Sequence, residues 1–143
     1  MSKQQFENKI YTLAHIIIIA ASGYYQHKVD YNEYKAIIDF LLSNTSTVKT
    51  RVKDDIIIEV GLSLQLVDES FSEIETIQSS IHNKVDHQKN MILSVKGKSK
   101  FGQGEHRNII AVFLLDWRGC STFPSSKVIR SLSSFLAESL TLK

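Results

Sequence analysis

The most regular hydrophobic pattern in the chain lies between Asp55 and Val67. From Ile58 to Leu66, apolar residues occupy every second position, with polar residues or glycine between them. Successive side chains of a strand point to opposite faces, so this spacing predicts a half-buried strand with one apolar face. A helix fits the spacing less well, because the polar residues would form two stripes separated by apolar ones. We therefore predict a strand over Asp55–Val67 and expect the rest of the chain to be organised around it.

Several other segments repeat apolar residues at the spacing of an amphipathic helix. These segments are Gln4–Ser22, Tyr31–Leu42, Phe71–Lys84 and Pro124–Leu140. Asp30 with Glu33, and Ser70 with Glu73, form capping boxes in front of the second and third of them. The polar segment Ser43–Thr50 is predicted to be a loop, because it is rich in residues that favour turns.

Two further segments are predicted to be strands. Met91–Val95 is short, and Asn108–Trp117 is apolar on both faces. Periodicity does not separate a buried strand from a buried helix in Asn108–Trp117, and we favour a central strand because β-branched and aromatic residues dominate. The glycine-rich residues between them, Lys96–Arg107, then form the tip of a β-hairpin. The predicted order is α-α-β-α-β-β-α in a single domain, an α+β fold with a mainly antiparallel sheet of about three strands covered by helices.

The first two predicted helices also resemble a known family. Residues 13–42, LAHIIIIAASGYYQHKVDYNEYKAIIDFLL, are similar to a helix pair in the TerB-like family of tellurite-resistance proteins. In that family an acidic-glycine turn separates the two helices, whereas Ser22 stands here in place of the acid before Gly23. The resemblance implies a chain that is helical throughout, in contrast to the strand predicted over Asp55–Val67.

Composition is that of an ordinary globular domain, with 43% hydrophobic and 22% charged residues. The formal net charge of +2 is below that expected of a protein that coats nucleic acid. The single cysteine, Cys120, excludes an internal disulfide and a cysteine metal cluster, and it fits a reducing, cytoplasmic compartment. The longest apolar run is far shorter than the roughly 20 residues that span a membrane, so we expect no membrane partner.

The most distinctive chemistry lies in the predicted hairpin tip. Lys96, Lys98, Lys100 and Arg107 surround Phe101, and nearby glycines would let the backbone approach a ligand closely. Cations beside an aromatic ring suit contact with phosphate and stacking of a base, so we predict that these five residues bind RNA or DNA. A charged, glycine-rich segment is equally typical of an ordinary hairpin end. The alternative therefore stays open that apolar faces of the domain bind a protein partner or a second copy of the chain.

A metal-dependent nuclease is a third alternative. Asp54, Asp55 and Glu59 on one predicted strand, with the Ser94 to Lys96 end of another, resemble the PD-(D/E)xK nuclease arrangement. Ser94 stands where the second metal-binding carboxylate belongs, which removes oxygen charge that a hard cation needs. We therefore predict a non-enzymatic binding module without a cofactor or a bound metal.

Two single residues are each given a structural interpretation. His15 is interpreted as a histidine at the edge of the core, bonded to a backbone carbonyl, because no second metal ligand follows it four residues later. Cys120 could act as a nucleophile, but nothing in the sequence places a histidine beside it, so it is interpreted as an incidental thiol.

Overall fold

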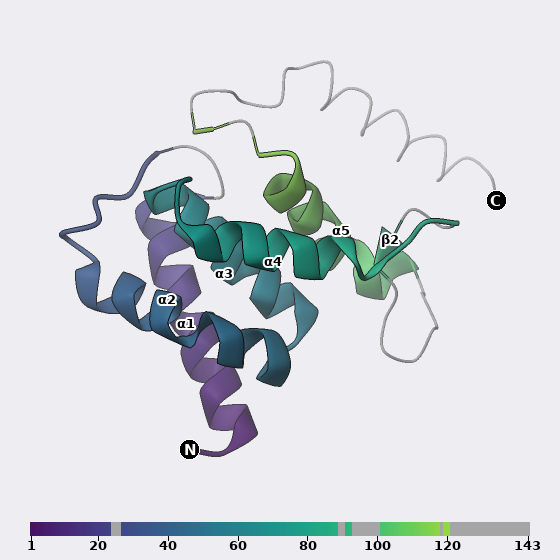
Figure 1. Cartoon of the computed structure of the whole chain (residues 1–143), viewed down its shortest axis with the longest axis horizontal. Helices are drawn as coiled ribbons and strands as arrows, with labels where there is room; N and C mark the ends of the chain where they lie inside the picture. The colour runs from purple at the N-terminus through teal and green to yellow at the C-terminus, as the bar shows by residue number, and fades with distance from the viewer. Residues whose placement is uncertain (24–26, 89–90, 93–100, 118, 121–143) are drawn as a thin grey trace.

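A central helix, α3 (Asp54–Val67), organises the structure, which is a computed structural model of the chain. The structure describes residues 1–23, 27–88, 91–92, 101–117 and 119–120. Four further helices pack around α3 (Figure 1): α1 (Lys3–Ala20), α2 (Lys35–Arg51), α4 (Ser72–His82) and α5 (Phe101–Leu115). Within the described residues, one small antiparallel sheet is present, formed by β1 (Val85–Asp86) and β2 (Met91–Ile92).

The strand predicted over Asp55–Val67 is wrong, and so is the α+β fold class that depended on it. This segment is helix α3, and every residue from Ile56 to Val67 is buried. A helix that is enclosed on all sides loses the amphipathic stripe by which a helix is recognised in a sequence. The chain is mainly helical with a two-stranded sheet, and not a three-stranded sheet covered by helices.

The first turn of α3 explains why a helix begins here. Asp54 and Asp55 both lie in that turn, where the positive end of the helix dipole favours negative charge. Glu7 of α1 is itself buried, and its Oε1 accepts a hydrogen bond of 3.1 Å from the backbone N–H of Lys53, the N-cap residue. The contact attaches α1 to the start of α3.

Gly61 lets α4 and α5 approach the middle of α3 closely. A Cβ atom at this position would lie 2.7 Å from Cδ1 of Leu114 and 3.1 Å from Cγ2 of Ile77. Glycine inside a helix costs about 1 kcal/mol relative to alanine. A larger residue at Gly61 would force the side chain of Leu114 to shift, so the present packing of Leu114 against α3 depends on this glycine.

The loop predicted over Ser43–Thr50 is also wrong, because α2 continues through it to Arg51. Polar side chains in this segment bond to carbonyl groups of the preceding turn. Ser43 Oγ donates to the carbonyl of Asp39, and Thr45 Oγ1 donates to that of Leu41. Serine and threonine that bond in this way stay inside a helix, although in a sequence they resemble turn residues.

The two predicted capping boxes do not cap helices. α2 begins at Lys35 and α4 at Ser72, so Asp30 and Ser70 lie outside both. Asp30 Oδ1 accepts instead from the N–H of Asn32, and Ser70 donates its N–H and its hydroxyl to Asp68. Asp30 and Asp68 therefore stabilise turns that precede α2 and α4.

The strand predicted over Asn108–Trp117 is wrong, since this segment is mostly the second half of α5, with Ile110 and Leu114 buried against the other helices. The helices predicted over Gln4–Ser22 and Phe71–Lys84 are confirmed as α1 and α4, with shifted ends. The mainly helical chain agrees with what the TerB-like resemblance implies.

The helix predicted over Pro124–Leu140 lies outside the described residues. In the part that the structure describes, no helix combines the length and the apolar character needed to cross a membrane.

Candidate functional site

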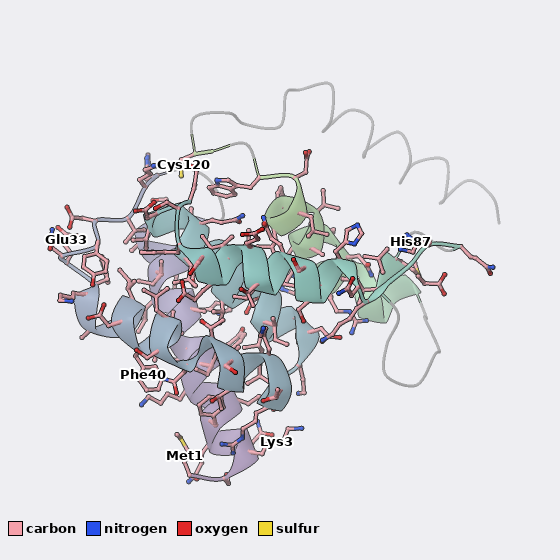
Figure 2. All side chains as sticks on the ribbon, in the orientation of Figure 1. Met1, Lys3, Glu33, Phe40, His87 and Cys120 are labelled. Atoms are coloured by element: carbon pink, nitrogen blue, oxygen red, sulfur yellow. The ribbon has the colours of Figure 1, made fainter. Side chains whose placement is uncertain are left out.

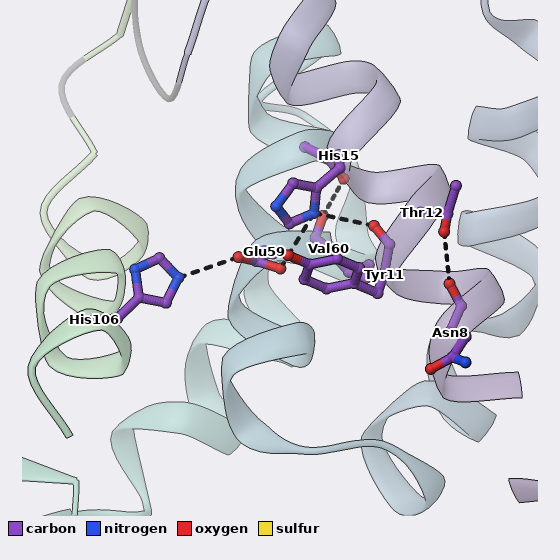
Figure 3. Close-up of polar contacts among 8 residues, drawn as sticks. Asn8, Tyr11, Thr12, His15, Glu59, Val60 and His106 are labelled. Carbon is purple, nitrogen blue, oxygen red and sulfur yellow. Dashed lines mark hydrogen bonds and ion pairs between the residues drawn. The ribbon is translucent and has the colours of Figure 1, made fainter. Parts of the chain in front are cut away.

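The carboxylate of Glu59 lies in the middle of α3, between α1 and α5, and only 2% of this residue is exposed. Its Oε1 is 3.3 Å from Nε2 of His106, on α5. Its Oε2 is 3.6 Å from Nδ1 of His15, on α1. Figure 3 shows the two imidazole rings approaching the carboxylate from opposite sides. Three helices thus each contribute one titratable side chain to a single cluster.

One oxygen of this carboxylate has no hydrogen-bond partner. Nδ1 of His15 is 3.1 Å from the carbonyl oxygen of Tyr11, which can only accept, so Nδ1 must carry the hydrogen. That hydrogen is directed to the carbonyl, and Oε2 of Glu59 remains buried and unpartnered among the described residues. The contact confirms the prediction that His15 is a core-edge histidine bonded to a backbone carbonyl.

Burial raises the pKa of Glu59 above its ordinary value, because a carboxylate loses its hydration when it is enclosed. The charges of His15 and His106 and the hydrogen bond from His106 act in the opposite direction. Asp55, one turn earlier on α3, adds a like charge that raises the pKa further. Burial is the largest of these effects, so Glu59 holds its proton to a higher pH than an exposed glutamate does.

The two histidines separate Glu59 from solvent to different degrees. The side chain of His106 is 63% exposed and that of His15 is 29% exposed. His106 therefore covers one side of the carboxylate and can leave it by side-chain rotation alone. No group of three histidine, cysteine, aspartate or glutamate residues in the described part of the chain is arranged to hold a metal ion. The arrangement is suited to proton exchange and to binding an external cation.

Exposed apolar side chains flank the cluster on both helices. The ring of Tyr11 lies against that of His15, with centroids 4.0 Å apart and planes tilted by 38°. Ile19 follows His15 by one turn of α1, and Ile109 follows His106 by one turn of α5; both are exposed, Ile19 by 72%. We refer to these residues and the carboxylate between them as the Glu59 surface: Tyr11, His15, Ile19, Glu59, His106 and Ile109.

Two of the residues predicted to bind nucleic acid, Phe101 and Arg107, lie on a helix and not at a hairpin tip. Phe101 is the first residue of α5, and Arg107 lies further along the same helix, with its Nε buried and unpartnered among the described residues. Lys96, Lys98 and Lys100 lie outside the described residues. RNA or DNA binding by this set stays a prediction, although the hairpin on which it was based is wrong.

The predicted strand that was to carry the acids of the nuclease-like arrangement is a helix. Asp54, Asp55 and Glu59 all lie on helix α3, and Asp54 is paired with Lys84. The segment Ser94 to Lys96 lies outside the described residues. The PD-(D/E)xK arrangement needs its first acid on a strand. Asp54, Asp55 and Glu59 lie on a helix, so they do not form this arrangement.

Cys120 lies at the edge of the domain, far from His87 (Figure 2). Burial raises the pKa of its thiol and outweighs the opposing charge of Lys28, while the charge of Glu69 adds a smaller increase. A raised pKa lowers the fraction of thiolate, which is the reactive form. These observations favour the interpretation of Cys120 as an incidental thiol.

The sequence contained one signal for the Glu59 cluster that pattern analysis missed. Glu59 and His15 are the titratable residues inside two of the apolar segments of the chain, 56–67 and 13–21. Two such groups in separate apolar segments can satisfy each other only if the segments pack together. Read as a strand, the central segment placed Glu59 on a solvent-exposed face, where it needed no partner.

The sequence profile of a domain of unknown function, DUF3541, matches residues 1–143, so the chain belongs to this family. Comparison with curated proteins and with solved structures gives no significant match.

Proposed function

We propose that this member of the DUF3541 family is a non-enzymatic binding module, and that it takes up a basic side chain of a partner protein at the Glu59 surface. The observation that carries this proposal is the buried, unpartnered Oε2 of Glu59. A buried carboxylate oxygen without a partner is costly, and an incoming cation offers it both charge and hydrogen bonds. A guanidinium fits best, because its planar set of N–H donors matches the two oxygens of a carboxylate.

The surroundings of Glu59 support uptake of a flat cation. His106 holds Oε1 by one hydrogen bond of 3.3 Å from a largely exposed side chain, so a ligand can replace it without moving α5. The adjacent, mutually tilted rings of Tyr11 and His15 lie beside the carboxylate (Figure 3). Aromatic faces stack on a guanidinium, and they would align it with the carboxylate.

The flanks of the Glu59 surface supply apolar contact area for the rest of the partner. Ile19 and Ile109 are exposed on either side of the cluster. A charged anchor in a desolvated position, surrounded by apolar contacts, is the usual arrangement of a binding hot spot. The same carboxylate would repel a phosphate backbone, so this surface favours a protein partner over nucleic acid.

Two matched peptides test the proposal. Both are capped pentapeptides of leucine, one with a central arginine and the other with a central citrulline, which has the same shape and no charge. Affinity is measured by calorimetry, and binding is located through the ring signals of His15 and His106 in NMR spectra. A charge-assisted hydrogen bond contributes about 1.5–3 kcal/mol, so the arginine peptide should bind at least about tenfold more tightly.

Matched variants separate the site from general electrostatics. Glu59→Gln should abolish the preference for arginine over citrulline, because the neutral amide attracts no cation. Glu33→Gln removes an equal charge from an exposed position and should leave the preference unchanged. Equal affinity of the two peptides for the natural protein, or an intact preference in Glu59→Gln, would refute the proposed function.

A further inference from the structure

A second cluster of unpartnered polar groups lies where α3, α4 and the end of α5 meet. A pocket of about 300 Å³ opens here, and its lining includes Gln65, Phe71, Glu75 and Trp117. This volume is at the lower end of the range for small-molecule sites. None of its lining residues belongs to the Glu59 surface.

Two of the residues that line the pocket each carry a polar atom without a partner among the described residues, one an acceptor and the other a donor. Gln65 is 2% exposed, and its Nε2 donates to the carbonyl of Leu114 at 3.1 Å. The other end of the same amide, Oε1, is buried without a partner, and so is Nε1 of Trp117. Buried polar atoms are nearly always hydrogen-bonded in folded proteins. Two exceptions among the lining residues of one pocket are an acceptor and a donor that a bound group would satisfy once these side chains turn toward it.

The charges around the pocket select the kind of donor. Glu69 and Glu75 contribute carboxylates to its lining, and no lysine or arginine is among the lining residues. The amide of Gln78 is already engaged, since its Nε2 donates to the carbonyl of Leu114 at 2.8 Å. Carboxylates beside a bare carbonyl oxygen favour a positively charged donor, and the ring of Trp117 adds a face that attracts cations.

We propose that this pocket binds a small organic cation of the amino-amide or amino-alcohol class. Its ammonium group donates to Oε1 of Gln65 within reach of the carboxylates. Its carbonyl or hydroxyl oxygen accepts from Nε1 of Trp117. Water alone would satisfy the two atoms singly, but it would not use the negative charge of Glu69 and Glu75. Recognition of the ammonium group is therefore the feature that distinguishes a ligand site from a hydrated pocket.

Fluorescence tests the proposal directly, because Trp117 is the single tryptophan of the chain. Glycinamide, which carries an ammonium and an amide, is the probe, and it is titrated at constant ionic strength. Acetamide lacks the ammonium and ethylammonium lacks the acceptor. A ceiling of about 1.5 kcal/mol per non-hydrogen atom limits a ligand of this size to about micromolar affinity at best, so the titration extends well into the millimolar range. A saturable change is expected with glycinamide, and about tenfold weaker responses with the other two compounds. No saturation up to about 100 mM, or equal responses to glycinamide and acetamide, would show a hydrated pocket and overturn the proposal.

Variants assign the response to the pocket. Gln65→Met removes the unused acceptor, and the bond from Gln78 still satisfies the carbonyl of Leu114. Glu75→Gln removes one charge at an exposed position of α4, where folding is not at risk. Each should weaken glycinamide binding at least about fivefold. Glu59→Gln should leave it unchanged, which separates this pocket from the proposed function. Unchanged binding in both pocket variants, or loss of binding in Glu59→Gln, would contradict the proposal.

Discussion

Glu7 and Glu59 are two carboxylates buried in the same helical core, and their surroundings differ. Glu7, which is 4% exposed, accepts a hydrogen bond from the backbone of Lys53 at the positive end of α3. Glu59 lies in the middle of α3, where backbone N–H groups are already used by the helix, and it depends on histidines from two other helices. The comparison indicates that backbone N–H groups can satisfy a buried acid at a helix start, whereas one in a helix interior depends on side chains of other helices or on an external group.

The largest effect is expected from a new buried acid with no partner at all. Leu62 and Ser63 are neighbours of Glu59 on α3, and both are fully buried. Leu62→Asp and Ser63→Asp should each destabilise the protein by more than about 3 kcal/mol, because an unpaired carboxylate loses its hydration. Denaturant melts measure the loss. The strand interpretation predicts a mild effect at Ser63, so a cost below about 0.5 kcal/mol there would argue against the buried helix.

Removal of Glu7 should be the next most damaging change. Glu7→Ala leaves the N–H of Lys53 without its acceptor and should cost about 1–3 kcal/mol. Glu7→Gln keeps an oxygen in place and should cost less than half of that. The two variants are compared by thermal and denaturant melts at neutral pH. If alanine and glutamine give the same stability as the natural residue, Glu7 does not hold the start of α3.

Glu59→Gln should have a smaller effect, and its sign should depend on pH. Because the pKa of Glu59 is raised in the folded state, its contribution to stability is full below the ordinary glutamate pKa and is lost as pH rises through the raised value. The neutral amide has no such loss. The variant should therefore gain stability relative to the natural protein as pH rises above the ordinary glutamate pKa and through the raised pKa of Glu59. His15, His106 and Asp55 face the same carboxylate and remain unchanged in the comparison. A variant that loses relative stability with rising pH would show that the ionised carboxylate is favoured.

The smallest effect is expected when a surface hydrogen bond to the exposed carboxylate of Asp68 is removed. Asp68 accepts the N–H and the hydroxyl of Ser70, and these bonds lower its pKa. Ser70→Ala removes only the hydroxyl bond at the surface, so the change in stability should stay within about 0.5 kcal/mol. The capping box read from the sequence would give about 1 kcal/mol. Chemical denaturation of this variant distinguishes the two, and a full cap loss would place the start of α4 at Ser70.

The sequence identified those helices that have one exposed face lined mainly by polar residues, which the second half of α5 lacks because Ile109, Val112 and Leu115 are exposed there. α1 and α4 were predicted because solvent-facing polar residues alternate with buried ones at helical spacing. α3 was missed because it is enclosed, and the second half of α2 was missed because its serine and threonine side chains bond within the helix. The surroundings of His15 were predicted correctly, but its proximity to Glu59 was not. The contact between Glu59 and His106 joins residues 47 positions apart, and local patterns carry no information on such a pairing.

The most direct test of the binding role of Glu59 is an NMR titration of its side-chain carboxyl carbon. The pH midpoint is measured in the free protein, and then with the arginine and the citrulline pentapeptides. The free protein should titrate above the ordinary glutamate value, because burial dominates. The arginine peptide should lower the midpoint, since a bound cation favours the ionised carboxylate, and the citrulline peptide should not. A midpoint at or below the ordinary value in the free protein, or the same midpoint with both peptides, would contradict the account.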